Sequence, residues 1–103
     1  MVPKVIAVDF DGTLCENDFP LIGEPKLHVI SALLQEREEG AKIILWTCRE
    51  GKLLVDAQEW CLKQGLAFDA INESIPEWRS IYENSPRKIG ASEYWDDRAV
   101  KIY

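Results

Sequence analysis

The sequence predicts an α/β fold: a three-layer, Rossmann-like parallel sheet with helices on both faces. Two observations support this prediction: short apolar runs of strand length alternate with segments whose apolar residues recur at helical spacing, and few residues separate them. Alternation of strand and helix implies parallel strands joined by right-handed crossovers, which place helices on the faces of the sheet. A chain of 103 residues is long enough for one hydrophobic core, so we expect residues 1–103 to form a single domain.

The first predicted element is a strand over residues 5–8, an unbroken apolar run typical of a strand buried on both faces. Asp9 stands at its carboxyl end and Asp11 follows two positions later, so both side chains begin on one side of an extended chain. Gly12 then ends this geometry, because a residue without a Cβ lets the main chain turn and approach a ligand such as phosphate. A bare D-x-D-G pattern is also an ordinary exit from a strand into a turn, so the rest of the chain decides its meaning.

A helix and a second strand follow. Pro25, the apolar spacing after it and Gly40 predict a helix over residues 25–39. The apolar run at residues 43–46 predicts another strand buried on both faces, and Thr47 ends it as Asp9 ends the first.

The second half of the chain continues this pattern. Apolar residues through positions 53–61 recur at helical spacing, and Gly65 ends this helix. The stretch from 72 to 91, rich in Pro and Gly, is expected to be mostly loop. The remaining expected elements are a strand at 67–71, about two turns of helix at 77–83, a strand at 92–95 and a short edge strand at 100–103.

Composition is that of an ordinary globular protein and restricts the partners. The chain is 47% hydrophobic and 29% charged, which excludes wholesale disorder. A formal net charge of −6 argues against a general nucleic-acid binder, since nonspecific affinity for phosphate backbones needs excess Lys and Arg, but it leaves phosphorylated substrates open. The apolar run before Asp9 is too short for a signal peptide or a membrane span, so we expect a cytoplasmic protein with no membrane partner.

The cysteines give no disulfide or zinc pattern. Cys15, Cys48 and Cys61 are an odd number without C-x-x-C spacing, so they predict free thiols. Cys48, between Thr47 and Arg49, is either near a reactive site or a small buried filler.

Polar residues follow the carboxyl ends of the predicted strands: Asp9 and Asp11 the first, Thr47 the second, and Asp96 and Asp97 the last. Because ligands bind beyond the carboxyl ends of parallel strands, these side chains are expected to meet at one edge. Crowded carboxylates require a cation, and oxygen ligands favour Mg²⁺ beside a substrate phosphate. The set suits phosphoryl transfer, in which positioning and charge neutralisation supply most of the rate.

The chain resembles the haloacid dehalogenase (HAD) superfamily, in its small capless form. The resemblance spans nearly the whole chain and rests on four short segments: residues 9–13 (D-F-D-G-T), residues 45–47 (L-W-T), Lys88, and Asp96-Asp97. Superfamily members that act as dehalogenases carry no acid at the position of Asp11. The acid at position 11 therefore favours phosphatase or phosphomutase chemistry, and the resemblance as a whole implies a phosphatase on a minimal core without a cap domain.

The resemblance also implies the role of each residue. Asp9 is the nucleophile that becomes an aspartyl-phosphate, and Asp11 protonates the leaving oxygen and later activates water. Thr47 binds the phosphoryl group and Lys88 stabilises its charge. Mg²⁺ is expected on oxygen ligands: Asp9, the main-chain carbonyl of Asp11, Asp96, and Asp97 directly or through water.

Some substrate contacts stay open at the level of sequence. Arg87 is the rival of Lys88 as the stabilising cation. Arg49 either binds phosphate with its planar guanidinium or forms a surface ion pair. Residues 15–24 are long enough for a small flap over the site, with Phe19 touching the substrate or packing on its own domain. The residues expected to border the substrate are Gly12, Thr13, Cys48 and Arg49.

The sequence thus predicts magnesium-dependent hydrolysis of a phosphate monoester. A phosphorylated small molecule is the favoured substrate, and a phosphorylated oligonucleotide end stays open. The alternative is a noncatalytic regulatory domain of the same fold that binds metal and phosphate. A phosphoacceptor signalling domain fits less well, because its phosphorylated Asp is expected after a central strand and not within D-x-D-G-T at the first strand. The sequence does not specify an oligomeric state.

Overall fold

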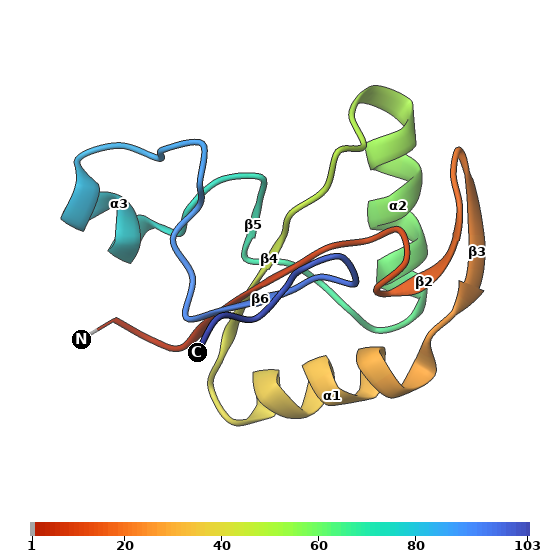
Figure 1. The fold of residues 1–103 in the computed structure, drawn as a ribbon, viewed down its shortest axis with the longest axis horizontal. Helices are drawn as coiled ribbons and strands as arrows, with labels where there is room; N and C mark the ends of the chain where they lie inside the picture. The colour runs from red at the N-terminus through yellow and green to blue at the C-terminus, as the bar shows by residue number, and fades with distance from the viewer. Residues whose placement is uncertain (1) are drawn as a thin grey trace.

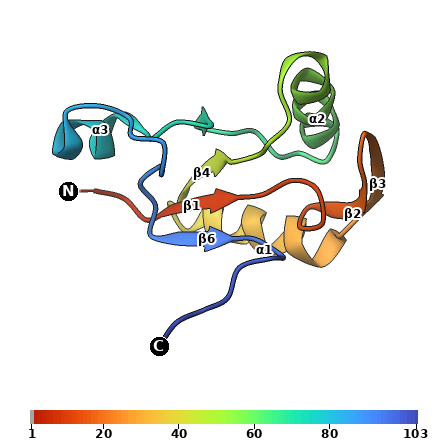
Figure 2. The same cartoon turned by 45° about the horizontal axis from the view of Figure 1, so that its top comes forward.

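The computed structural model describes residues 2–103 and contains a four-stranded parallel sheet. Its strands are β1 (Val5–Val8), β4 (Lys42–Leu45), β5 (Ala70–Ile71) and β6 (Glu93–Trp95), in the spatial order β5-β4-β1-β6. Figures 1 and 2 show β1 running between β4 and β6. The predicted parallel α/β arrangement is confirmed and is consistent with a Rossmann-like fold.

β1 and β4 form the centre of the sheet because both are almost entirely apolar. All of β1 is buried, as is β4 after its first residue. Ile6 and its β4 partner Ile43 join one core cluster, whereas the next pair, Ala7 and Ile44, joins another. Alternation of side chains along a strand places the two clusters on opposite faces of the sheet.

Helices α1 (Leu27–Glu38) and α2 (Gly51–Lys63) share the first of these clusters. Each buries an apolar face: Ile30 and Leu33 belong to α1, Ala57 and Cys61 to α2. The predicted helices are therefore confirmed within a few residues at each end.

The other cluster is covered by the segment that contains α3 (Pro76–Tyr82). Ile75 and Ile89, which flank this region, pack there against Val5 and Ile44 of the sheet. The short helix expected within the long loop is thus present, and it begins with Pro76 at its first turn, where a missing amide hydrogen costs least.

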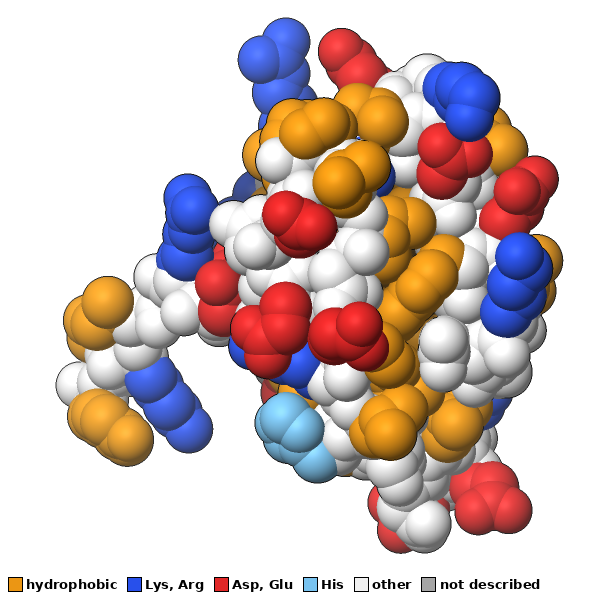
Figure 3. Space-filling view, turned by 90° about the vertical axis from the view of Figure 1, so that its right-hand side faces the viewer, with side chains coloured by type: hydrophobic (Ala, Val, Ile, Leu, Met, Phe, Trp, Pro, Cys, Tyr) orange, Lys and Arg blue, Asp and Glu red, His pale blue; other side chains and the backbone are white. Residues whose placement is uncertain are grey.

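An antiparallel hairpin of β2 (Cys15–Asp18) and β3 (Leu21–Pro25) lies between β1 and α1 in sequence. It occupies the segment expected to form a flap, and Figure 1 shows it beside α2, at the end of the molecule away from α3. The space-filling view of this end, Figure 3, shows a stripe of hydrophobic side chains bordered by charged ones. Pro25 pairs with Cys15 in the hairpin, so it ends β3 instead of opening α1 as expected.

Two strand predictions are wrong in extent or in kind. The strand expected at 67–71 covers only Ala70–Ile71. Just before it, the amide of Ile43 donates to the side-chain carboxylate of Asp69 (2.8 Å). A longer strand would instead offer a main-chain carbonyl to this amide. Residues 100–103 form no strand, and Val100 and Ile102 are exposed. Among residues 2–103, β6 pairs only with β1. Within residues 2–103, no helix has the length and apolar character needed to cross a membrane.

Candidate functional site

The carboxyl ends of three strands meet at one edge of the sheet. Asp9 directly follows β1, and its amide donates to the carbonyl of Trp95, the last residue of β6 (2.9 Å). On the other side, the amide of Trp46 donates to the carbonyl of Val8 (2.9 Å), which brings Thr47 to the same edge. The parallel register therefore places the loops after β1, β4 and β6 together, as the sequence predicts.

Three carboxylates form a tight acidic cluster at this edge. Oxygen atoms of Asp9, Asp96 and Asp97 all lie within 4.8 Å of one another. The pKa of Asp9 is raised to about 6, first because burial removes water from the carboxylate and then because Asp96, Asp97 and Asp11 repel its charge. A cation bound among these oxygens would relieve this repulsion.

The loop after β1 holds Asp97 in the cluster. The Thr13 hydroxyl donates to Asp97 Oδ1 (3.3 Å) and accepts from the Asp97 amide (3.1 Å). Gly12 has φ +88°, and a Cβ there would lie 2.8 Å from Asp97 Cγ, so a larger residue would strain the backbone and displace the Asp97 carboxylate. Lys26, which the sequence analysis did not single out, donates from Nζ to the Gly12 carbonyl (2.6 Å). In this conformation Gly12 and Thr13 position an acid of the cluster.

A pocket of about 370 Å³ opens beside the acidic cluster. Its wall combines acids, hydroxyl and amide groups, two arginines and one aromatic ring: Asp9, Asp11, Asn17, Phe19, Thr47, Cys48, Arg49, Asp96 and Arg98. The structure thus brings together most of the residues singled out from the sequence. Cys48 is exposed at the pocket, which removes the alternative of a buried filler.

Thr47 faces the pocket with its hydroxyl partly engaged. Its Oγ1 accepts from the Arg49 amide (3.1 Å), and its own amide donates to Asn72 Oδ1 (2.8 Å). Asn72 follows β5 and has φ +53°. The hydroxyl hydrogen of Thr47 is left to donate to a ligand, because the bond to Arg49 uses only the oxygen.

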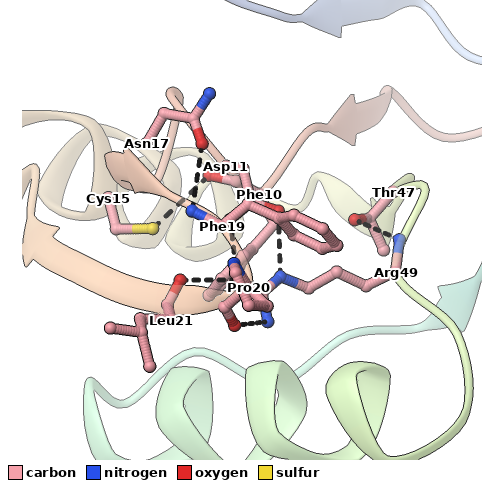
Figure 4. A network of polar contacts seen from close by, with 9 residues as sticks. All are labelled: Phe10, Asp11, Cys15, Asn17, Phe19, Pro20, Leu21, Thr47 and Arg49. Carbon is pink, nitrogen blue, oxygen red and sulfur yellow. Dashed lines mark hydrogen bonds and ion pairs between the residues drawn. The ribbon is translucent and has the colours of Figure 1, made fainter.

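Arg49 holds Asp11 in a bidentate ion pair. Arg49 Nε donates to Asp11 Oδ2 (2.9 Å) and Nη2 donates to Asp11 Oδ1 (2.8 Å), as Figure 4 shows. The Arg49 side chain is only 1% exposed. The sequence left Arg49 between a phosphate ligand and a surface ion pair, and the structure places it in a buried ion pair at the pocket wall.

Lys88 does not line this pocket. Its Nζ lies 5.7 Å from the centre of the Tyr94 ring, and the Lys88 side chain is exposed, as is the rival Arg87. Tyr94 belongs to the cluster on the α3 face, and Ile89 next to Lys88 is also in that cluster. In this conformation the chain between 72 and 91 therefore carries the predicted third motif away from the acidic edge.

Arg98 is a pocket residue that the sequence analysis missed. It lines the pocket with an exposed side chain, and its amide donates to Asp96 Oδ1 (2.9 Å). Its position directly after Asp96-Asp97 is the signal that points to it, since a loop that brings two acids to the site brings its next residue as well. Arg98 offers the pocket a cation whose side chain is not engaged with Asp11.

The donor set of the acidic cluster suits Mg²⁺. Asp9, Asp96 and Asp97 offer hard carboxylate oxygens without nitrogen or sulfur ligands, the set that Mg²⁺ and Ca²⁺ prefer over Zn²⁺. Burial first, and then repulsion by the neighbouring carboxylates, raises the pKa of Asp9, and a cation bound there would favour its ionised form. The residues present therefore fit the expected metal.

Fold and site together define an α/β protein with an acidic pocket at the carboxyl edge of a parallel sheet. No family model and no curated protein matches the chain. A solved structure described as the conserved protein coded by a locus from Bacteroides thetaiotaomicron is 41% identical, with a TM-score of 0.84, over 96% of this chain and 79% of that chain. The chain belongs to the same family as this Bacteroides protein.

Proposed function

We propose that the protein is a magnesium-dependent phosphomonoesterase that works through an aspartyl-phosphate on Asp9. The observation that carries the proposal is the position of Asp9, which lies in the acidic cluster and also lines the pocket. A nucleophile and an adjacent metal site opening onto one cavity are the essential parts of phosphoryl transfer. The proposal includes a three-layer, capless HAD core, in which the β2–β3 hairpin is the element nearest to a lid.

Asp9, Asp96 and Asp97 would hold Mg²⁺, with the main-chain carbonyl of Asp11 as a further oxygen ligand. When bound, the ion neutralises charge on the nucleophile and on the phosphoryl oxygens. Thr13 and Gly12 support this set by keeping Asp97 in place.

The reaction divides between Asp9 and Asp11. An Asp9 oxygen forms a bond to phosphorus as the ester P–O bond breaks, and the leaving oxygen takes the proton of Asp11. Water then attacks the aspartyl-phosphate, gives its proton to Asp11 and releases inorganic phosphate, which restores Asp9. Two acids are needed because one of them is covalently occupied when the proton has to move.

Two other groups bind the phosphoryl oxygens in this proposal. The Thr47 hydroxyl donates a hydrogen bond, and Arg98 supplies the positive charge that the sequence analysis assigned to Lys88. The pocket volume of about 370 Å³ suits a phosphorylated small molecule, and a phosphorylated oligonucleotide end enters only if it extends through the pocket mouth.

The test is hydrolysis of p-nitrophenyl phosphate, followed by a screen of sugar phosphates, nucleotides and 5′- or 3′-phosphorylated oligonucleotides, each with Mg²⁺ and with EDTA. We expect turnover only with Mg²⁺, and a loss of at least ~10³-fold in Asp9→Asn. Asp18→Asn is the matched control, because Asp18 is an exposed acid of the hairpin outside the pocket lining. Full turnover in Asp9→Asn would disprove the nucleophile.

A second candidate is the noncatalytic domain that binds metal and phosphate. Two observations favour it: Lys88 lies away from the pocket, and both Asp11 oxygens are engaged by Arg49. Calorimetry distinguishes the candidates. Binding of Mg²⁺ and inorganic phosphate by a protein that hydrolyses none of the esters would establish the second candidate and exclude the first.

A further inference from the structure

Arg49 is a buried cation that bridges two parts of the pocket wall. Its guanidinium donates two hydrogen bonds to Asp11, in the loop after β1, and two to main-chain carbonyls at the turn of the hairpin. The carbonyls belong to Pro20 (3.3 Å from Nη1) and Leu21 (2.9 Å from Nη2). A buried guanidinium is costly unless it is paired and hydrogen-bonded, and these contacts meet that need.

Two aromatic rings complete the surroundings of the guanidinium. The centres of Phe10 and Phe19 lie 5.0 and 5.2 Å from Arg49 Cζ, within cation–π distance. Phe10 is fully buried in the core, whereas Phe19 at the hairpin turn is 55% exposed and lines the pocket. Figure 4 shows the guanidinium lying among Phe10, Asp11 and the hairpin turn. Arg49 therefore connects the core, the acid and the hairpin.

An ion pair that only stabilised the fold would not need to lie in the wall of the pocket. Asp11 and Phe19, two partners of Arg49, both line the pocket in which a substrate would bind. Every guanidinium nitrogen donates to Asp11 or to the hairpin, so Arg49 has little capacity left for a phosphate. Its influence on the reaction therefore passes through Asp11 and through the hairpin.

We infer that Arg49 is a positioning residue that aims Asp11 at the leaving oxygen and fixes the β2–β3 hairpin over the same space. The inference rests on the proposed phosphatase function. When Asp11 carries its proton, one oxygen turns to donate to the leaving oxygen while the other still accepts from Arg49. Once that proton has passed to the leaving oxygen, the ionised Asp11 again accepts from Arg49 with both oxygens. The water that attacks the aspartyl-phosphate then returns a proton to Asp11, which completes the cycle.

Leaving-group dependence tests this inference, since an ester with a good leaving group needs no proton from Asp11. The two probes are p-nitrophenyl phosphate and an alkyl phosphate, measured with Mg²⁺ for wild type, Arg49→Lys and Arg49→Gln. We compare kcat/KM, because it reports the steps up to the aspartyl-phosphate and excludes the later attack of water, in which Asp11 acts on both esters alike. We expect kcat/KM to fall by about 100-fold or more for the alkyl ester, within the range of general acid catalysis, and by less than about 10-fold for the nitrophenyl ester. Arg49→Lys combined with Asp11→Asn should lose little beyond Asp11→Asn alone, because the two residues act as a unit.

Arg79→Lys is the matched control, because Arg79 forms an exposed ion pair with Glu73 and neither residue lines the pocket. Phe19→Ala provides a second test if the Arg49 variants do not fold, because it leaves the ion pair of Arg49 and Asp11 intact. We expect a smaller loss of kcat/KM in this variant, and again a larger loss for the alkyl ester than for the nitrophenyl ester. Equal losses of kcat/KM on both esters, or no loss on either, in whichever of these variants folds would overturn the inference while the phosphatase stands. A wild type inactive on both esters would overturn the phosphatase proposal and this inference with it.

Discussion

Gly12 and Asp97 share a space that a larger residue at position 12 would fill. We predict that Gly12→Ala destabilises the fold and weakens Mg²⁺ binding. The backbone at φ +88° costs an alanine roughly 1–3 kcal/mol, and its methyl group also displaces the Asp97 carboxylate. Urea unfolding and magnesium titration by calorimetry measure the two effects.

Gly65→Ala is the matched control for this change. Gly65 has a similar φ of +82°, and nothing lies within 4 Å of the position of its Cβ. Gly65→Ala should show only the loss of unfolding free energy that comes from the strained backbone, and its magnesium affinity should be unchanged. Equal magnesium affinity in Gly12→Ala and Gly65→Ala would contradict the role of Gly12 in placing Asp97.

Asp9 should make the metal-free protein less stable as the pH rises. Its folded pKa of about 6 lies above the ordinary value of 3.8, so the folded state binds the proton more tightly than the unfolded state. The stabilisation that comes from this tighter proton binding is present below about pH 4 and is lost as the pH rises through about 6. After allowance for solvent screening of a half-buried group, the loss is on the order of 1 kcal/mol.

Urea unfolding in EDTA at a series of pH values measures this dependence. Asp9→Asn should remove this part of the slope, because an amide does not titrate. Asp18→Asn, on the exposed hairpin, should keep it. The same slope in wild type and Asp9→Asn would show that Asp9 titrates normally.

The sequence predicts the acids of the site well and the cations poorly. Asp9 and Asp96 directly follow strands, so a parallel sheet alone brings them to one edge. Lys88 lies in a long loop whose path no periodicity specifies, and it ends over Tyr94. The partner of Arg49 is likewise set by tertiary packing, since Asp11 lies 38 positions away in the sequence.

Among the elements, prediction succeeds where a pattern is long or unbroken. β1 and α2 agree with expectation because one is a continuous apolar run and the other repeats an apolar face. The hairpin is harder to predict, because β2 has only one buried residue and no alternation of buried and exposed positions. The segment at 100–103 contains residues typical of strands, but a strand forms only where another strand lies beside it to share hydrogen bonds. Residues 100–103 are exposed and pair with no strand.

Deletion of residues 100–103 should leave the fold almost unchanged. These residues make no strand pairing, and their side chains are exposed, so little apolar area leaves water when the protein folds. We expect a change in unfolding free energy within about 0.5 kcal/mol. Chemical denaturation of the truncated chain measures it, and a loss above about 2 kcal/mol would mean that the segment packs in solution.

The molecule as a whole protects two of its thiols and exposes the third. Burial raises the pKa of the Cys61 thiol to about 12 and also raises that of Cys15, whereas Cys48 is exposed at the pocket. A thiol reagent at about pH 8 should therefore modify Cys48 rapidly and the other two only on unfolding. Cys48→Ser should abolish the rapid phase.

Ligand protection extends this experiment to the pocket. Inorganic phosphate with Mg²⁺ should slow the modification of Cys48, because Cys48 lines the cavity in which phosphate would bind. The slow phase from Cys15 and Cys61 serves as the internal control, because neither lines the cavity. A rapid phase from Cys61 would contradict the packing of α2 on the sheet.

The acidic cluster joins the loop after β1 to the loop after β6, the first and last strands of the sheet along the described chain. An ion held there would add a link between two segments that the short β1–β6 pairing and the hydrogen bonds between Thr13 and Asp97 already connect. Such a tie closes a long stretch of polypeptide, and in unfolded chains the entropy gained on opening grows with the length enclosed. Loading with the cation should therefore slow the detachment of the β6 edge more than that of the hairpin, and amide hydrogen exchange at Tyr94 and Trp95 would record the difference.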